Sequence, residues 1–222
     1  MRLWKPALFT APLVSAILDG RKTMTRRVTR PQPDEDPGRP LAVIGDLLYR
    51  WVAVPARATS PMAPERAGFA VLGNHKPIRC PWPVRTRLWV RETTALVYNG
   101  GGMYCADGAT IPGWTWRYSR DVCPTIHMRR DCARIGLEVT AVRCERVQDI
   151  TEADAIAEGI DPREVAARGW TDARTGFRIL WDSLNAKRGY GWGANPWVFA
   201  YGFKLLSTDY AETQRLMTED AK

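Results

Sequence analysis

The sequence predicts an α+β fold in which one curled β-sheet has short helices packed at its ends. Two observations lead to this class. Stretches that alternate β-branched or aromatic residues with other side chains recur along the chain, as in strands with one buried face. Helix signals are fewer, and the segments that carry them are short. With 222 residues, of which 45% are hydrophobic, the chain can bury one sizeable core, so we expect a single domain over residues 1–222.

The first expected helix covers residues 12–19. Pro12 suits the first turn of a helix, where its missing N–H is not needed, and Gly20 can adopt the left-handed conformation that ends a helix. In the next segment, residues 21–28, threonines alternate with longer side chains. This pattern predicts a strand that begins near Thr23.

Three further strands are expected in the middle of the chain. Residues 47–54 and 87–92 are rich in aromatic residues and alternate in character. Residues 134–147 form one long strand pattern, but the apolar residues change face between Val139 and Val142, which predicts a β-bulge. Proline, glycine and charged residues gather in two segments that we expect to be loop insertions in the same domain, residues 29–40 and 59–76.

The C-terminal part predicts short helices and then a strand. Thr151 can cap a helix that Gly159 should stop, and Asp161 with Pro162 predicts the start of another. An amphipathic helix follows, with apolar residues at helical spacing: Phe177, Leu180, Trp181 and Leu184. The apolar and aromatic run over residues 196–206 predicts the last strand.

Charge and cysteine content limit the kinds of partner. The net charge of +8 comes mainly from arginine and favours an anionic partner such as nucleic acid, while a basic protein that binds no such partner is the alternative. The five cysteines form an odd set without a C-x-x-C pair, so we expect reduced thiols, no metal and no cofactor. Cys123, His127 and Cys132 lie close in sequence and leave a metal site as the alternative.

The first 20 residues contain basic and apolar side chains, but Lys5, Pro6, Pro12 and Asp19 interrupt the apolar run. This pattern argues against a signal peptide or a membrane-spanning segment. We therefore expect no membrane partner and a cytoplasmic location. Nothing in the sequence indicates an oligomeric state.

The segment from Gly20 to Arg27 contains the pattern G-x-K-x-x-T-x-R directly after the first expected helix. In this it resembles the signature of ASCH domains, whose fold is a PUA-like β-barrel. Later segments are similar to those of the larger ASCH-like proteins of phages and prophages: LWVRET at 88–93, SRDVCPTIHM at 119–128, ITEADAIAEGI at 150–160 and NPWVFAYGF at 195–203. The resemblance implies a PUA-like curled barrel and the cytoplasm of a bacterium or a phage-infected host cell.

The chain departs from the family pattern at one turn. Family members usually have a Gly-Asp turn just before the LWVRE strand, whereas this chain has Arg85 and Thr86 there. A Gly-Asp pair does occur earlier, at Gly45 and Asp46. Either the turn chemistry has changed or an insertion has displaced the usual hairpin.

The resemblance also implies an activity. Small bacterial ASCH proteins are amidohydrolases that remove the acetyl group from N4-acetylcytidine, and their catalytic residues are a lysine, a threonine and a glutamate. Matching motif to motif places these on Lys22, Thr25 and Glu158. The glutamate is matched through a T-E-x-x-x-x-x-E pattern that begins at Thr151.

Amide hydrolysis needs a nucleophile, a base that activates it and an acid for the leaving amine. We expect Thr25 to attack the acyl carbonyl or to orient a water, and Lys22 to be the base if desolvation lowers its pKa. Glu158 would then transfer a proton to the cytosine N4. Lys22 and Thr25 would point to opposite faces of a regular strand, so Lys22 should lie in the turn before it. Neither side chain is expected to contribute to core packing.

Other side chains are candidates for substrate binding. Arg27 shares strand parity with Thr25 and could hold a carbonyl oxygen or a phosphate. Each further candidate also has a structural alternative, namely a core aromatic, a salt-bridged strand end or a hydrogen-bonded histidine. These candidates are Trp89, Arg91, Glu92 and His127.

Three functions remain open at this point. The first is an amidohydrolase that removes an N4-acyl group from cytidine or a related modified base. The second is a non-catalytic PUA-like module that binds a modified base in RNA or DNA, and the third is a metal-independent ribonuclease. The enzyme predicts a small pocket where the three catalytic candidates converge, whereas a binding module predicts an open basic groove whose affinity falls steeply with salt.

Overall fold

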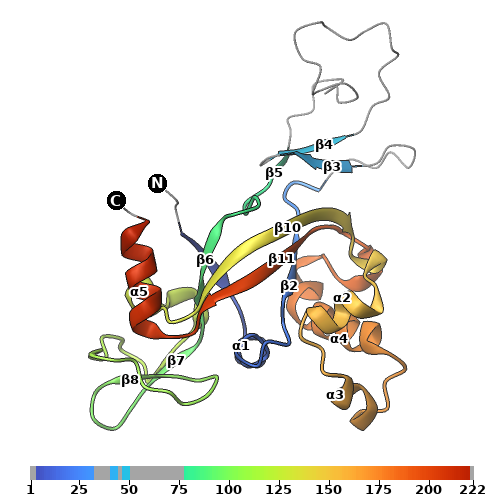
Figure 1. Ribbon diagram of the computed structural model, residues 1–222. Coiled ribbons are helices and arrows are strands. Elements are labelled where there is room, and N and C mark those ends of the chain that lie inside the picture. The colour runs from blue at the N-terminus through green and yellow to red at the C-terminus, as the bar shows by residue number, and fades with distance from the viewer. Residues whose placement is uncertain (1–3, 33–40, 45–46, 51–77, 221–222) are drawn as a thin grey trace, which may run out of the picture.

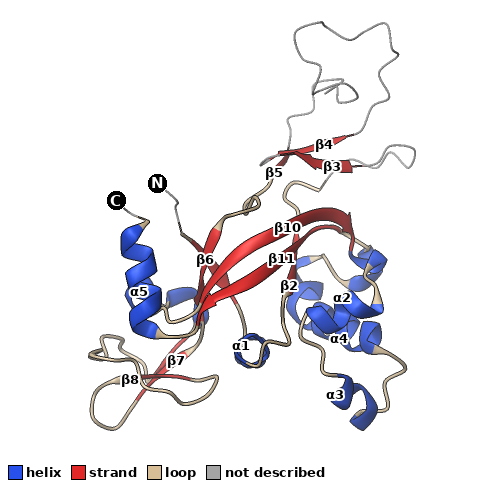
Figure 2. Cartoon of the chain, in the orientation of Figure 1, coloured by secondary structure: helices blue, strands red, loops and turns tan. Residues whose placement is uncertain are grey.

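The computed structural model describes residues 4–32, 41–44, 47–50 and 78–220, and it has an α+β fold with mixed sheets and short helices (Figure 2). Several expected features lie wholly or partly outside the described residues. They are the insertion at 59–76, most of the insertion at 29–40, the second half of the strand at 47–54, and the Gly45–Asp46 pair.

The central sheet has five strands in the order β1-β6-β10-β11-β2. β1 pairs parallel with β6, and the other neighbours pair antiparallel. Four of the five strands expected from the sequence, those near Thr23, Arg87, Arg134 and Pro196, therefore share one sheet, and β1 is an addition to it. The fifth expected strand, which begins at residue 47, belongs to a separate sheet. The strand bounds are β1 Lys5–Leu8, β2 Met24–Val28, β6 Arg87–Arg91, β10 Gly136–Arg146 and β11 Trp197–Ser207.

β10 and β11 form a long curved ribbon that crosses the molecule (Figure 1). The register between them shifts between Val139 and Ala141, which confirms the predicted irregularity in this strand. An extra residue on one strand increases local twist and bends the ribbon. The bend makes the sheet curl, with helices gathered at both ends of the ribbon (Figure 1).

Two small sheets flank the central one (Figure 1). One consists of β3 Leu41–Ile44, β4 Leu47–Arg50 and β5 Ile78–Arg79. The other consists of β7 Thr94–Leu96, β8 Gly102–Tyr104 and β9 Val122–Cys123.

The helices begin and end close to the predicted positions. Gly20 has a φ of +72° after α1, Thr151 Oγ1 accepts a hydrogen bond from the Asp154 N–H at the start of α2, and Asp161 caps α3. One helix was not expected: α5 follows β11, and Asp220 at its end accepts a 2.7 Å hydrogen bond from Trp4 Nε1, which joins the two ends of the chain. The helix bounds are α1 Ala11–Leu18, α2 Glu152–Ala157, α3 Pro162–Ala167, α4 Ala173–Asn185 and α5 Tyr210–Glu219.

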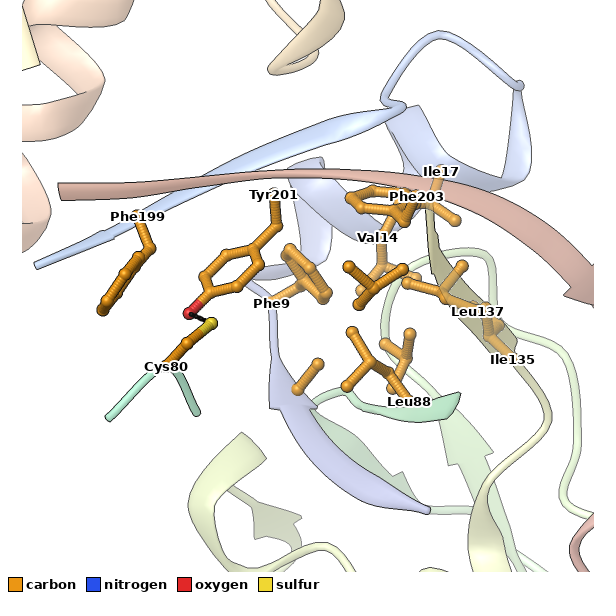
Figure 3. Packing of buried hydrophobic residues seen from close by; sticks show 13 residues of the cluster. Phe9, Val14, Ile17, Cys80, Leu88, Ile135, Leu137, Phe199, Tyr201 and Phe203 are labelled. Carbon is orange, nitrogen blue, oxygen red and sulfur yellow. Dashed lines mark hydrogen bonds between the residues drawn. The ribbon is translucent and has the colours of Figure 1, made fainter. Parts of the chain in front are cut away.

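The main core lies between α1 and the concave face of the sheet (Figure 3). Val14 and Ile17 of α1 pack with residues of β6, β10 and β11, among them Leu88 and Phe203. A second cluster holds α4 against α2 and β11 and includes Phe177, Trp181, Ala155 and Val198. This second cluster fixes α2 and α4 beside β2, where the candidate site lies.

The turn before β6 contains a residue in the left-handed conformation. Arg85 has a φ of +69°, a left-handed conformation that favours glycine, and the Thr86 N–H donates to the Pro83 carbonyl at 3.0 Å. A tight turn therefore directly precedes β6.

The five cysteines are free thiols, of which Cys105 is exposed. Among the described residues, no group of three or more His, Cys, Asp or Glu side chains is arranged to hold a metal ion. Within the same part of the chain, none of the helices is both long enough and apolar enough to cross a membrane.

Candidate active site

A pocket of about 420 Å³ opens between β2, α2 and α4. It contains all three catalytic candidates, together with Arg27. One wall is basic and the other consists of apolar side chains from α4. The lining residues include Lys22, Thr25, Arg26, Arg27, Arg30, Glu158, Phe177, Leu180, Trp181, Leu184, Asn185 and Arg188.

Backbone hydrogen bonds place Lys22 outside the strand, as expected. The Lys22 N–H donates to the Ala16 carbonyl of α1 at 2.9 Å, and the Thr23 N–H donates to the Ala157 carbonyl of α2 at 2.9 Å. β2 begins only at Met24. The turn between α1 and β2 is therefore attached to the end of α2, and Lys22 can share a pocket with Thr25 despite the strand alternation.

Lys22 and Glu158 form a buried ion pair. Lys22 Nζ lies 2.8 Å from Glu158 Oε2, 2.7 Å from the Glu158 carbonyl oxygen and 2.7 Å from the Met24 carbonyl oxygen. The two residues are 2% and 3% exposed. Burial lowers the pKa of Lys22, and the neighbouring Glu158 carboxylate opposes that shift. Because all three ammonium hydrogens have acceptors in the fold, Lys22 is also a structural residue, contrary to the expectation from sequence.

Arg26 completes the charge network behind Glu158. Its guanidinium contacts Glu158 Oε1 at 3.2 Å, Glu145 Oε1 at 2.6 Å and Asp154 Oδ2 at 2.7 Å. On a regular strand, the side chains of the neighbours Thr25 and Arg26 point to opposite faces. The guanidinium nevertheless reaches the pocket, because Glu158 at the end of α2 extends towards it, and no local sequence signal indicates this contact.

Arg27 is held differently. Its Nη2 donates to the Leu8 carbonyl at 2.6 Å, and its guanidinium lies over the rings of Phe9 and Trp82 at 5.1 and 5.6 Å. Its Nε is buried without a hydrogen-bond partner, and it makes no ion pair with a described residue. Burial lowers the pKa of Arg27, and the Glu158 carboxylate in the same pocket opposes that shift. A half-buried cation whose direct contacts are all neutral is costly unless an anion can approach it.

Thr25 is 4% exposed and lines the pocket, with Tyr201 of β11 as its strand partner. Its hydroxyl makes no side-chain hydrogen bond to the part of the chain that the structure describes. Lys22 Nζ donates to other acceptors and not to this hydroxyl. The pocket therefore brings the two residues together without a direct nucleophile–base contact.

The remaining candidates lie elsewhere. Trp89, Arg91 and His127 line a second pocket of about 710 Å³ between β6, the 127–131 segment and α5. Arg91 donates to the Met128 carbonyl at 2.8 and 3.1 Å and lies over the Trp89 ring. The predicted substrate-binding residues are thus divided between two pockets, with only Arg27 beside the catalytic candidates.

Glu92 lines neither pocket. It is fully buried, and both carboxylate oxygens accept hydrogen bonds from Arg134, at 3.0 and 2.9 Å. Burial raises the pKa of Glu92, and Arg134 opposes the shift. Glu92 is therefore salt-bridged, as in its structural alternative, but it is buried rather than at an exposed strand end, and its partner is Arg134.

Comparison of the chain with protein-family models, with curated proteins and with solved structures gives no match. The chemistry of the site must therefore be argued from its own residues. Lys22 and Glu158 can share and transfer a proton across 2.8 Å, Thr25 offers a hydroxyl in the same pocket, and the surrounding arginines favour an anionic or strongly polar ligand.

Proposed function

We propose that the protein is an amidohydrolase that removes an N4-acyl group, such as acetyl, from cytidine or a related modified base. The observation that carries the proposal is the buried Lys22–Glu158 pair in the same pocket as Thr25. The pocket volume of about 420 Å³ falls within the range of small-molecule sites. Proton-transfer groups that converge in one small pocket favour an enzyme over a module with an open binding groove.

We infer that the reaction uses a water molecule oriented by the Thr25 hydroxyl, because Lys22 makes no hydrogen bond to that hydroxyl. Lys22 first gives one of its three protons to Glu158, which frees an electron pair on Nζ, and the resulting amine accepts a proton from the water as the water oxygen bonds to the acyl carbon. The bond between the acyl carbon and N4 then breaks, and Glu158 gives its proton to N4. The products are a carboxylic acid and the free exocyclic amine of cytosine.

Direct attack by Thr25 is the alternative within the same function. The Thr25 oxygen would form an ester with the acyl carbon as the bond from that carbon to N4 breaks, the hydroxyl proton would pass to N4 of the leaving cytosine, and water would hydrolyse the ester in a second step. Mass spectrometry of the quenched enzyme distinguishes the two routes, because only direct attack adds the mass of the acyl group to the protein.

We also propose that the curled sheet is a PUA-like barrel of the ASCH type. The side chain of Arg27 on β2 donates to the carbonyl of Leu8 at the end of β1, and these strands are the two edges of the five-stranded sheet. The approach of the two edges supports a sheet that curls towards closure.

The rival function is a module that binds a modified base in RNA or DNA, and five basic side chains around the same pocket favour it. One experiment separates the candidates. The protein is incubated with a panel of N4-acylated cytidines and with RNA, and the products are separated by chromatography. Cytidine release supports the amidohydrolase, and RNA fragments would indicate a ribonuclease. Binding without any product, weakened steeply by salt, would indicate the binding module.

A further inference from the structure

The basic wall of the 420 Å³ pocket contains two kinds of arginine. Arg26 contacts three carboxylates, so its charge is compensated within the fold. Arg27, Arg30 and Arg188 make no ion pair with any described residue. We propose that these three arginines form a phosphate-binding site, so that the substrate is a phosphorylated nucleotide, free or within a polynucleotide. The identity of the base rests on the proposed function, but the phosphate site does not.

Arg27 supplies the innermost positive charge. Its side chain is half-buried, has one neutral hydrogen-bond acceptor in Leu8 and leaves the buried Nε without a partner. The rings of Phe9 and Trp82 support it from the side. Such a guanidinium retains donors for an oxyanion, and its planar fork matches two phosphate oxygens.

Arg188 and Arg30 supply the outer charges. Arg188 follows α4 and donates to Asn185 Oδ1 at 2.5 Å, and Arg30 lies over the Tyr190 ring at 5.5 Å. Both side chains thus have neutral neighbours that orient them without neutralising them. Burial lowers the pKa of Arg27, the Glu158 carboxylate opposes that shift, and repulsion from Arg188 adds to it. A bound anion would reduce the repulsion between these positive charges, which meet at the pocket from distant parts of the chain.

The opposite wall suits the rest of a nucleotide. Phe177, Leu180 and Leu184 present apolar surface from α4 to the same pocket. A base or ribose can therefore pack on α4 while its phosphate contacts the arginines, and a free nucleoside would leave the arginines without an anion. The other basic pocket differs in that a carboxylate of its own lining, Asp131, is paired with Arg129 at 2.8 Å.

The test compares a nucleotide with its nucleoside, using the whole protein and no turnover. Calorimetry measures the Kd of cytidine, cytidine 5′-monophosphate, cytidine 3′-monophosphate and a short cytidine-containing oligonucleotide at low salt. We expect the wild-type protein to bind at least one phosphorylated ligand about tenfold or more tightly than cytidine, as charge-assisted hydrogen bonds would give. If a cytidine monophosphate binds most tightly, the site recognises the terminal phosphate of a mononucleotide. If the oligonucleotide binds most tightly, the site recognises the backbone phosphate of a polynucleotide.

Variants then test the residues. Arg188→Gln and Arg30→Gln should each reduce the preference for the phosphorylated ligand over cytidine by roughly five- to tenfold. Arg163→Gln is the matched control, since Arg163 is exposed on α3 and does not line the pocket. Circular dichroism checks that each variant is folded.

The outcomes separate this inference from the proposed function. A phosphate preference that both variants reduce supports the site even if no acylated base is hydrolysed. Equal affinity for nucleotide and nucleoside, or no measurable binding of either, would overturn the site even if N4-acetylcytidine is hydrolysed. An equal loss in Arg163→Gln would show that the preference reflects net charge rather than these arginines.

Discussion

Lys22 donates two hydrogen bonds to the single residue Glu158, one to its carboxylate at 2.8 Å and one to its backbone carbonyl at 2.7 Å. Glu158 directly follows the last residue of α2, where helix carbonyls lack intrahelical partners. One lysine thus caps a helix end, neutralises a buried carboxylate and provides the proposed base. The pair therefore stabilises the fold and also supplies the proposed proton transfer, so substitutions in it should affect both stability and turnover.

The first prediction concerns the stability of this pair. Glu158→Gln leaves the Lys22 charge buried without its carboxylate, and we expect a loss of about 3 kcal/mol or more in the free energy of unfolding. Lys22→Met should cost less, because Glu158 keeps Arg26 as a partner. The double variant should lose less than the sum of the single losses. Urea denaturation measures all three.

The exposed pair of Glu164 and Arg168 on α3 supplies the control for that experiment. Glu164→Gln should change the free energy of unfolding by at most about 0.5 kcal/mol, since solvent screens an exposed pair. Additive losses at Lys22 and Glu158 would mean that the ion pair makes no separate contribution to stability.

The second prediction concerns turnover of an N4-acylated cytidine. Thr25→Val keeps the shape but removes the hydroxyl, and Glu158→Gln removes the proton transfer, so each should lower the rate on the order of 10² to 10⁴. Thr25→Ser should retain most of the activity. Because Lys22 and Thr25 act on the same step, the double variant Lys22→Met/Thr25→Val should be little slower than either single variant.

Kinetics with matched protein concentrations test this coupling. Independent, multiplying losses in the double variant would refute the shared step. If the wild-type protein is inert on every acylated base, while the same substitutions change binding by modest additive amounts, the protein is the binding module instead.

The third prediction concerns pH. Lys22 must lose a proton before it can accept one from water, and burial lowers its pKa below the ordinary value of 10.5. The rate should therefore rise with pH and level off below pH 10.5. Thr25→Val should keep the same rise at a lower rate, whereas Lys22→Met should lose it. A rate independent of pH across this range in the wild type would exclude Lys22 as the base.

The free energy of unfolding should also depend on pH through Lys22, and the direction of the change can be predicted. Between the lowered folded pKa of Lys22 and its unfolded value, the unfolded chain binds more protons than the folded chain, so the folded state gains stability as pH rises. The gain belongs to Lys22 only if it disappears in Lys22→Met. The useful measurement is thus the difference in unfolding free energy between the wild type and this variant, at neutral and at alkaline pH.

Local patterns in the sequence predicted local structure well. The left-handed Gly20, the cap at Thr151, the turn position of Lys22 and the irregularity after Val139 all follow from interactions between near neighbours. α5 also had such a signal, since Asp209 accepts from the Glu212 N–H as an N-cap, but the preceding strand pattern masked it. These features depend on backbone conformation, which short-range chemistry determines.

The charge pattern of the pocket could not be predicted in this way. Arg188 and Arg27 come together only because the second core cluster packs α4 beside β2. The distribution of substrate candidates between two pockets has the same origin. Trp89 and Arg91 belong to β6, which is separated from β2 by β10 and β11 in the sheet. Alternation along a strand predicts which face of the sheet a side chain lies on, but it does not predict which strands lie next to each other in the curled sheet.

The fourth prediction concerns Arg85, whose φ of +69° precedes β6. A residue with a Cβ in the left-handed region costs roughly 1 to 2 kcal/mol, and glycine avoids this cost. Part of this gain is offset, because glycine raises the conformational entropy of the unfolded chain and so stabilises the unfolded state by about 0.4 to 1 kcal/mol. Arg85→Gly should therefore raise the free energy of unfolding slightly.

The neighbouring residue makes this effect testable by urea denaturation. Val84 lies in the same turn and is exposed, but it has no positive φ, so Val84→Gly gains flexibility in the unfolded state without relieving strain. It should lose stability while Arg85→Gly gains it, and Arg85→Val should lose most, because a β-branched residue is poorly accommodated at positive φ. If both glycine variants lose stability equally, the left-handed turn at Arg85 is not a strained feature of the folded protein.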